Sequence, residues 1–193
     1  MPTRETADLP RPKIEVIETK IKGCYELRPT VLDDQRGFFA KIFHRPVWEK
    51  LGLCTEFDEE YVTRSLPGTL RGLHLQVPPM HHHKVVLCLR GRAWDVAVDL
   101  RKGSQTYGQY ASVNLSCTMA NAMYLPPGLA HGFCVMGAEA LLYYKLSSVY
   151  SPAHDVGIRW DSVGIPWPIS DPVLSERDKR LPPLAEFDSP IEI

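Results

Sequence analysis

A histidine flanked by two leucines is the residue whose type and setting most clearly suggest acid–base chemistry. It is His74, in the run RGLHLQ at positions 71–76, shortly before Lys84 and a strand-like stretch. An imidazole titrates near neutral pH and can therefore take a proton from a substrate. Taken alone, a histidine between leucines is more often a hydrogen-bonded core residue. If the protein is an enzyme, we predict that His74 is its general base.

A second pattern is that of the cupins, which are jelly-roll proteins. The run PPGLAH at 126–131 matches the second cupin motif, in which a glycine permits a tight turn and His131 projects into the barrel. Three histidines stand at 81–83, but no carboxylate follows them to complete a site of two histidines and one carboxylate. Lys84 follows instead, and its charge repels a cation. We therefore predict no metal and interpret the three histidines as an exposed polar loop.

Composition indicates an ordinary protein with a single domain. The 193 residues are 44% hydrophobic and 23% charged, with a formal net charge of −1. No basic surface for nucleic acid is evident, and no apolar run approaches the roughly 20 residues of a membrane helix. The five cysteines are scattered as in proteins with reduced thiols, and the first residues lack a signal peptide's apolar core. We expect a cytoplasmic protein.

Short strands account for most of the chain. Strand-like runs occur at 14–17, 24–27, 38–43, 61–64, 84–89, 93–100, 110–115, 123–125, 132–135 and 140–146. Residues 93–100 alternate strictly between two faces, and Gly91–Arg92 before them predicts a tight hairpin. Asp95 and Asp99 share one of these faces, and we interpret them as structural residues that hydrogen-bond loops. The spacing predicts an all-β sandwich or barrel.

Two short helices complete the predicted domain. Residues 46–51 begin with a proline and precede a glycine, and Ser175 is placed to cap a one-turn helix. The tail from Pro152 is rich in proline and tryptophan and should wrap the core. We expect a flexible lead-in at 1–13, a domain at 14–184 that includes this tail, and a C-terminal end at 185–193.

Six motifs in a fixed order resemble a known family. They are DQRGFF (34–39), RGLHLQ (71–76), WDVAVDLR (94–101), PPGLAHGF (126–133), LYYK (142–145) and LSERD (174–178). The series resembles the dTDP-4-dehydrorhamnose 3,5-epimerase family from about residue 14 to residue 184. The resemblance implies a jelly-roll domain that forms homodimers. It also implies inversion of C3, C5 or both in a nucleotide-diphosphate-linked 4-keto-6-deoxyhexose, without a cofactor, with thymidine diphosphate as the default nucleotide.

The same resemblance assigns catalytic roles to particular residues. It implies that His74 is the general base, that Asp178 is its carboxylate partner, and that Tyr144 is the general acid. Lys84 and His131 would lie near the ketone oxygen. These assignments suit the chemistry, because a proton next to a ketone can be removed only if the enolate oxygen is stabilised while a base is in reach.

The proposed acid has an aromatic neighbour. A phenol has an ordinary pKa of about 10 and is neutral at working pH, so that it can donate a proton. The pattern alone does not distinguish Tyr143 from Tyr144. The spacing to Tyr150 and the following Lys145 favour Tyr144.

Further positions match residues that bind the substrate. Those implied to hold the diphosphate are Arg36, Arg71 and Arg177, whose guanidinium groups suit oxygen pairs. Those implied to line the nucleotide or sugar are Phe39, Tyr150 and Asp155, the last standing where glutamate is expected. Three more depart from the pattern: Lys41, Glu59 and Tyr61 stand where the family usually has glutamate, glutamine and asparagine, respectively. They leave the nucleotide base and the exact sugar open.

Three alternatives remain open at this stage. The nearest is a ketoisomerase of the same fold that moves the carbonyl between C3 and C4. A metal-dependent cupin oxygenase is a second, and an inactive sugar-nucleotide-binding module is a third. The joint presence of His74, Lys84, Tyr144 and Asp178 argues against the inactive module.

Overall fold

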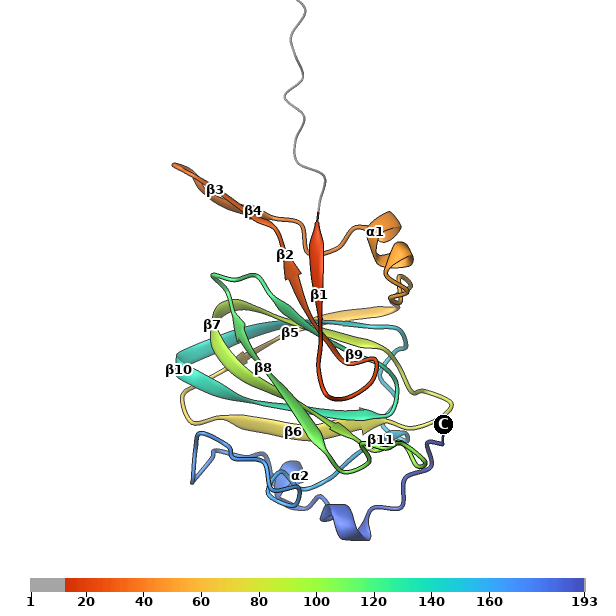
Figure 1. The fold of residues 1–193 in the computed structure, drawn as a ribbon. Helices are drawn as coiled ribbons and strands as arrows, with labels where there is room; N and C mark the ends of the chain where they lie inside the picture. The colour runs from red at the N-terminus through yellow and green to blue at the C-terminus, as the bar shows by residue number, and fades with distance from the viewer. Residues whose placement is uncertain (1–12, 193) are drawn as a thin grey trace, which may run out of the picture.

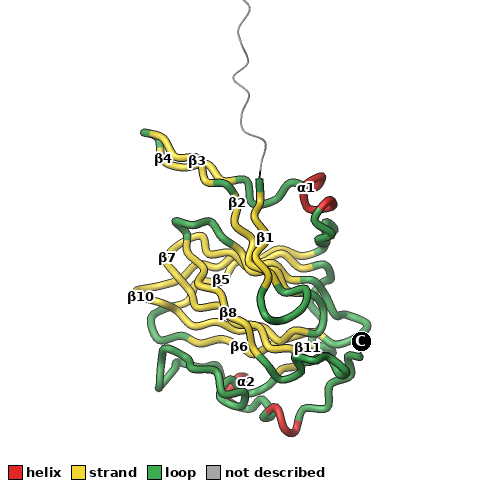
Figure 2. Tube along the Cα trace, viewed as in Figure 1, coloured by secondary structure: helices red, strands yellow, loops and turns green. Residues whose placement is uncertain are grey.

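The computed structural model describes residues 13–192, so that nearly all of the predicted lead-in lies outside the described residues. Strands dominate this part of the chain (Figure 2). In chain order they are β1 (Ile14–Glu18), β2 (Tyr25–Pro29), β3 (Val31–Asp34), β4 (Gly37–Ala40), β5 (Glu59–Ser65), β6 (Leu70–Gln76), β7 (Lys84–Asp99), β8 (Tyr110–Ser116), β9 (Ala122–Leu125), β10 (Leu129–Leu146) and β11 (Asp155–Gly157). The helices are α1 (Arg45–Lys50), α2 (Glu176–Lys179) and the 3-10 helix η1 (Leu184–Glu186). Within the described part, none of them is long and apolar enough to cross a membrane.

Two long, bent strands hold the fold together. The first part of β7 pairs with β9 and with the second part of β10, whereas its second part pairs with β8 and with the first part of β10. One side of the molecule therefore has the strand order β1-β2-β9-β7-β10-β5, and the other has β8-β7-β10-β6-β11. Two antiparallel sheets that share two strands and curl around one interior form a jelly-roll barrel (Figure 1). The predicted all-β class is confirmed.

The hairpin predicted at Gly91–Arg92 is wrong, because β7 continues through both residues. Gly91 pairs with Ala140 of β10 at the bend between the two parts of the strand. The bend requires a glycine, since its φ is +77° and a Cβ there would lie 2.0 Å from the carbonyl oxygen of Glu139. The two separate strands predicted for β10 are likewise one strand with an irregularity in its middle.

Strand alternation sends neighbouring side chains to different cores. Val86 is among the residues that fill the barrel interior. On the outside of one sheet, Trp48 of α1 packs over the strands, and on the outside of the other, Val96 packs against Ile158 of the tail. The alternation predicted for residues 93–100 is confirmed, because one face meets the tail and the other meets the interior.

The C-terminal tail wraps one sheet, as predicted (Figure 1). It begins at β11, which pairs with β6, and Ile158 just beyond it is fully buried. Ser175 caps α2 as expected, by accepting a hydrogen bond from the backbone N–H of Asp178 at 3.0 Å. The packing extends past residue 184, since Ile191 is buried in the same cluster. The tail is therefore an integral part of the domain.

Replacing Ile158 with alanine should lower the free energy of unfolding by about 2–5 kcal/mol, because the truncated side chain leaves a cavity beneath the tail. Urea unfolding followed by circular dichroism measures the change. Ile158→Val is the matched control and should cost only about 0.5–1.5 kcal/mol. Equal stability of Ile158→Ala and the wild type would show that the tail is not anchored at this residue.

Candidate active site

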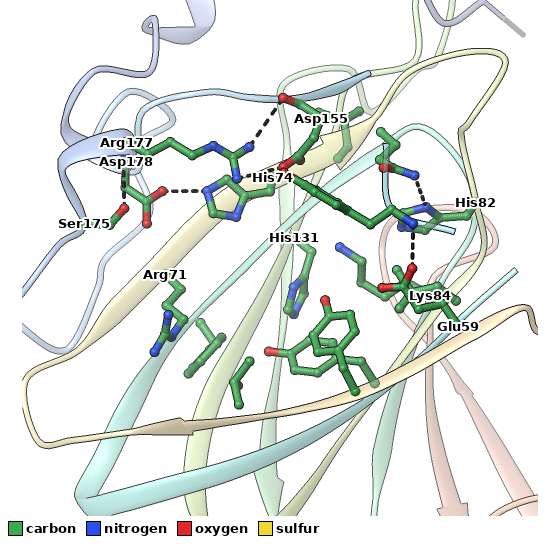
Figure 3. Close-up of a pocket in the computed structure, with 18 residues that line it drawn as sticks. Glu59, Arg71, His74, His82, Lys84, His131, Asp155, Ser175, Arg177 and Asp178 are labelled. Carbon is green, nitrogen blue, oxygen red and sulfur yellow. Dashed lines mark hydrogen bonds and ion pairs between the residues drawn. The ribbon is translucent and has the colours of Figure 1, made fainter. Parts of the chain in front are cut away.

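A cavity of about 410 Å³ lies between β5, β6, β10 and the part of the tail that carries α2 (Figure 3). All but three of the predicted site residues line it. Those that do are Glu59, Tyr61, Arg71, His74, Lys84, His131, Tyr144, Tyr150, Asp155, Arg177 and Asp178. The fold thus gathers side chains from distant parts of the sequence around one space.

Strand alternation explains why these side chains point inward. On β6, Leu73 and Leu75 pack against the tail, so that His74 between them faces the cavity. On β7, Val85 packs outward beneath α1, and Lys84 before it faces inward. β6 lies outside the predicted strands. Leu73 and Leu75 are apolar because the tail covers that face of β6, whereas the opposite face, which carries His74, lines the cavity.

His74 binds the carboxylate of Asp178 (Figure 3). Its Nε2 lies 2.6 Å from Oδ1, and the side chain of Asp178 is 4% exposed. Oδ2 accepts the backbone N–H of Gly72 at 3.3 Å. The pKa of Asp178 lies below its usual value. Burial alone would raise it, but the hydrogen bond and charge of His74 outweigh this effect, together with hydrogen bonds from Gly72 and Ser175. With Nε2 on the carboxylate, Nδ1 of a neutral ring is the free, proton-accepting nitrogen.

Lys84 places a buried ammonium group in the same cavity. The residue is 8% exposed. Burial lowers its pKa to about 8, while the carboxylates of Asp155 and Asp95 oppose the shift. The group is therefore charged at neutral pH, in surroundings where a positive charge acts strongly on a nearby oxygen.

Tyr144 faces the cavity, whereas Tyr143 packs on the α1 side of the sheet. Burial raises the pKa of Tyr144 well above its ordinary value, and charge repulsion from Asp95 and from the ionisable hydroxyl group of Tyr61 adds to the rise. The phenol is therefore protonated at any working pH. Its ring is stacked on that of Tyr61, with 4.6 Å between the centroids.

His131 forms a second imidazole–carboxylate pair, with Asp95. Nε2 and Oδ1 are 2.8 Å apart, and both side chains are buried. Burial lowers the pKa of His131, although Asp95 opposes the shift. Asp99 behaves as predicted, since it accepts hydrogen bonds from Arg101 and Ser104 in a loop. Asp95 instead hydrogen-bonds to His131, which lines the cavity, and its place on β7 does not distinguish it in sequence from Asp99 on the same face.

Charged groups also occupy the part of the cavity nearest the tail. Arg177 of α2 forms an ion pair with Asp155 of β11 at 2.8 Å. Arg71 of β6 lines the same cavity. Glu59 accepts the backbone N–H of Tyr150 at 2.6 Å (Figure 3), and so ties β5 to the segment before β11. Two guanidinium groups in one cavity suit an anionic ligand.

Three predicted binding residues, Arg36, Phe39 and Lys41, do not line the cavity. They lie on or next to the β3–β4 hairpin, which projects from the barrel (Figure 1). Phe39 is 59% exposed, and the neighbouring Phe38 is 53% exposed. The hairpin therefore presents large apolar side chains and an arginine to its surroundings.

The histidine run at 81–83 is not the exposed loop that we predicted. Only His81 is exposed. His82 lines the cavity and lies 3.2 Å from the side-chain nitrogen of Gln76, and burial lowers its pKa to about 3, so that it is neutral. His83 is bound to Tyr124 at 2.7 Å. Throughout residues 13–192, no group of three or more His, Cys, Asp or Glu side chains is arranged to hold a metal ion.

Fold and cavity together define a jelly-roll protein whose cavity contains a carboxylate-bound imidazole, a neutral phenol and a buried ammonium group. The family model for dTDP-4-dehydrorhamnose 3,5-epimerase matches residues 18–186. The dTDP-4-dehydrorhamnose 3,5-epimerase of Shigella flexneri is 41% identical over 168 residues, which cover 86% of this chain and 93% of the relative. The chain belongs to this family and is an epimerase, an enzyme of the isomerase class.

Other relatives extend the comparison. The dTDP-4-dehydrorhamnose 3-epimerase of Streptomyces niveus is 37% identical over 169 residues, which cover 86% of this chain and 82% of the relative. The crystal structure of a dTDP-6-deoxy-D-glucose-3,5-epimerase from Legionella pneumophila, in complex with dTDP-4-keto-L-rhamnose, has a TM-score of 0.86. That protein is 36% identical, and the match covers 91% of this chain and 95% of the other. The family thus includes relatives named for one inverted centre and for two.

We expect the side-chain amine of Lys84 to titrate with a midpoint near 8, because burial disfavours its charged form. The ¹³Cε resonance of isotopically labelled protein, followed from pH 6 to pH 11, measures this pKa. Lys84→Met assigns the resonance by removing it. A midpoint near 10.4, the value of an unperturbed lysine, would contradict the burial of the charge.

Proposed function

We propose that the chain inverts C3, C5 or both of a dTDP-linked 4-keto-6-deoxyhexose through an enolate intermediate, as a step of deoxysugar biosynthesis. The observation that carries this proposal is the 2.6 Å contact between His74 and Asp178 in a cavity that also holds Lys84. The names of the relatives support a dTDP-linked 4-keto sugar as the substrate.

In the first step, His74 removes the proton from the carbon next to the ketone. The C–H bond breaks, its proton moves to Nδ1, and the electron pair moves through the carbon–carbon bond onto the ketone oxygen. Asp178 stabilises the imidazolium that forms, as its charged carboxylate already lies on Nε2. Lys84 stabilises the negative oxygen, and this works best below pH 8, where the ammonium group is charged.

In the second step, Tyr144 returns a proton to the opposite face of the carbon. The enolate electrons form the new C–H bond, the phenol proton supplies the hydrogen, and the ketone is restored. A protonated phenol suits this role because its raised pKa keeps the proton in place until the enolate has formed. Exchange with solvent then removes the proton from His74 and returns one to Tyr144.

The nucleotide diphosphate needs positive charge near the cavity. Arg71 and Arg177 provide it, and their forked guanidinium groups match pairs of phosphate oxygens. Arg177 is paired with Asp155 in the structure, so that the diphosphate must share this arginine with the carboxylate or displace it. Because α2 carries both Arg177 and Asp178, a diphosphate bound to Arg177 can also orient Asp178.

We infer that the enzyme is a homodimer in which the β3–β4 hairpin of one subunit reaches the cavity of the other. Arg36, Phe39 and Lys41 lie away from the cavity of their own chain, on a projecting hairpin with two exposed phenylalanines. Exposed aromatic side chains next to an arginine are typical of contact surfaces. In such a dimer, Phe39 can pack on the nucleotide base and Arg36 can bind the diphosphate.

We also infer a cytoplasmic location. All five cysteines are free thiols, and three of them are buried within the domain. A β-rich protein of this size with five unpaired cysteines suits a reducing compartment.

His74→Ala should lower kcat for the epimerisation by about 100- to 10,000-fold, because the reaction loses its base. The measurement is ¹H NMR of dTDP-4-keto-6-deoxyhexose in D₂O, which follows deuterium uptake separately at C3 and C5. His154→Ala is the matched control, since His154 hydrogen-bonds to Ser151 and does not line the cavity. Exchange at the wild-type rate in His74→Ala would remove His74 from the role of base. No exchange in the wild-type enzyme would overturn the proposed reaction.

Mixing two variants of lowered activity should restore activity if the hairpin serves the partner's cavity. A Phe39→Ala subunit keeps its own His74, and a His74→Ala subunit keeps its own Phe39. One of the two cavities in a mixed dimer therefore contains both residues. Co-expression followed by tandem-tag purification gives mixed dimers, which should recover up to half of the wild-type kcat. Sedimentation analysis that finds only monomers, or mixed dimers as inactive as their parents, would contradict this arrangement.

A further inference from the structure

We propose that Tyr61 is a positioning residue that holds the ring of Tyr144 in one orientation and so determines which carbon next to the ketone is protonated faster. The inference rests on the proposed role of Tyr144 as the general acid. Tyr61 stands where the resemblance predicts asparagine, so that the feature distinguishes this chain from the expected pattern.

The two tyrosines are direct neighbours across two strands. Tyr61 of β5 and Tyr144 of β10 are register partners in the antiparallel pair, and both line the cavity. Their ring centroids are 4.6 Å apart and the ring planes differ by 20°, which is a stacked arrangement. Aromatic pairs at directly opposed strand positions attract one another. The stack therefore holds one face of the Tyr144 ring.

A second contact limits the other movements of this ring. His131 meets Tyr144 edge-on, with 5.9 Å between the centroids and 78° between the planes. His131 is itself fixed by its hydrogen bond to Asp95. Tyr144 is 3% exposed, so that most of its surface is packed against other residues. A large swing of the phenol would have to break the stack with Tyr61 or displace His131.

A fixed phenol has a chemical consequence. C3 and C5 lie on either side of the ketone carbon, so that one stationary hydroxyl group is equally close to both only if it lies midway between them. Proton transfer is sensitive to such placement, and a displacement of about 1 Å can cost about 100-fold in rate. A clamped Tyr144 should therefore serve one carbon better than the other, whereas a mobile ring would serve both more evenly. Tyr61 is thus a specificity-determining residue, although it need not exchange a proton itself.

Two substitutions separate the ring of Tyr61 from its hydroxyl group. Tyr61→Phe keeps the stack, and Tyr61→Leu removes it while leaving an apolar side chain. The control is Val62→Ala, because Val62 is the next residue on β5, is 57% exposed and pairs with Tyr143 instead. Circular dichroism and thermal unfolding check that each variant is folded.

Deuterium uptake at C3 and C5, with kcat and KM for each variant, tests the proposal. We expect the wild type to exchange one carbon about 10- to 100-fold faster than the other, with the same ratio in Tyr61→Phe and Val62→Ala. In Tyr61→Leu the ratio should move toward 1 and kcat should fall about 10-fold, with KM nearly unchanged. An unchanged ratio in Tyr61→Leu would overturn the proposal. A loss in Tyr61→Phe as large as that in Tyr61→Leu would also overturn it, because Tyr61 would then act through its hydroxyl group.

A readout that does not depend on activity separates this inference from the proposed function. Protein labelled with 3-fluorotyrosine should show one sharp ¹⁹F resonance for Tyr144, assigned by its loss in Tyr144→Phe. The resonance should stay sharp in Tyr61→Phe and become averaged or split in Tyr61→Leu. A sharp resonance in Tyr61→Leu would show that Tyr61 does not hold the ring. If the wild type exchanged neither carbon, the epimerase proposal would fail, and the fluorine spectra would still decide whether the clamp exists.

Discussion

The hydrogen bond between His74 and Asp178 is the interaction on which the site depends, and it joins two parts of the chain that meet only in the folded state. His74 lies on β6, and Asp178 lies within the long tail that packs on the outside of the same sheet. That packing uses Leu73 and Leu75, which flank the histidine. The residues that dock the tail and the residue that needs its carboxylate are therefore consecutive. The packing of the tail on β6 therefore also places Asp178 beside His74.

The bent strands β7 and β10 explain how so many polar groups can share one interior. Each strand belongs to both sheets, and its inward face passes from an apolar core to the cavity. Burial of apolar side chains in the core stabilises the fold, and burial of charged groups around the cavity partly offsets this stabilisation. For Lys84 alone, a pKa lowered from 10.5 to about 8 corresponds to a cost on the order of 3 kcal/mol. Buried charge of this kind is retained where chemistry needs it and is rare elsewhere.

Carboxylates give two of the imidazoles that line the cavity, those of His74 and His131, different properties. Asp178 is also bound by the backbone of Gly72 and by a helix cap, so that it stays charged beside His74. Asp95 sits in the barrel wall, where burial keeps His131 neutral in spite of its partner. A charged carboxylate therefore lies on the ring of His74, whereas His131 is neutral and packs against the ring of Tyr144.

The sequence by itself determined the features that depend on a few neighbouring residues. The alternation of residues 93–100, the helix near Pro46 and the cap at Ser175 follow from local rules, and the ordered motifs pointed to His74. Only the tertiary structure decided that β7 bends through Gly91, that Asp95 binds His131 and that Tyr61 stacks on Tyr144. These features depend on which strands lie side by side and in which register. That choice minimises the free energy of the whole barrel, and no short stretch of residues contains it.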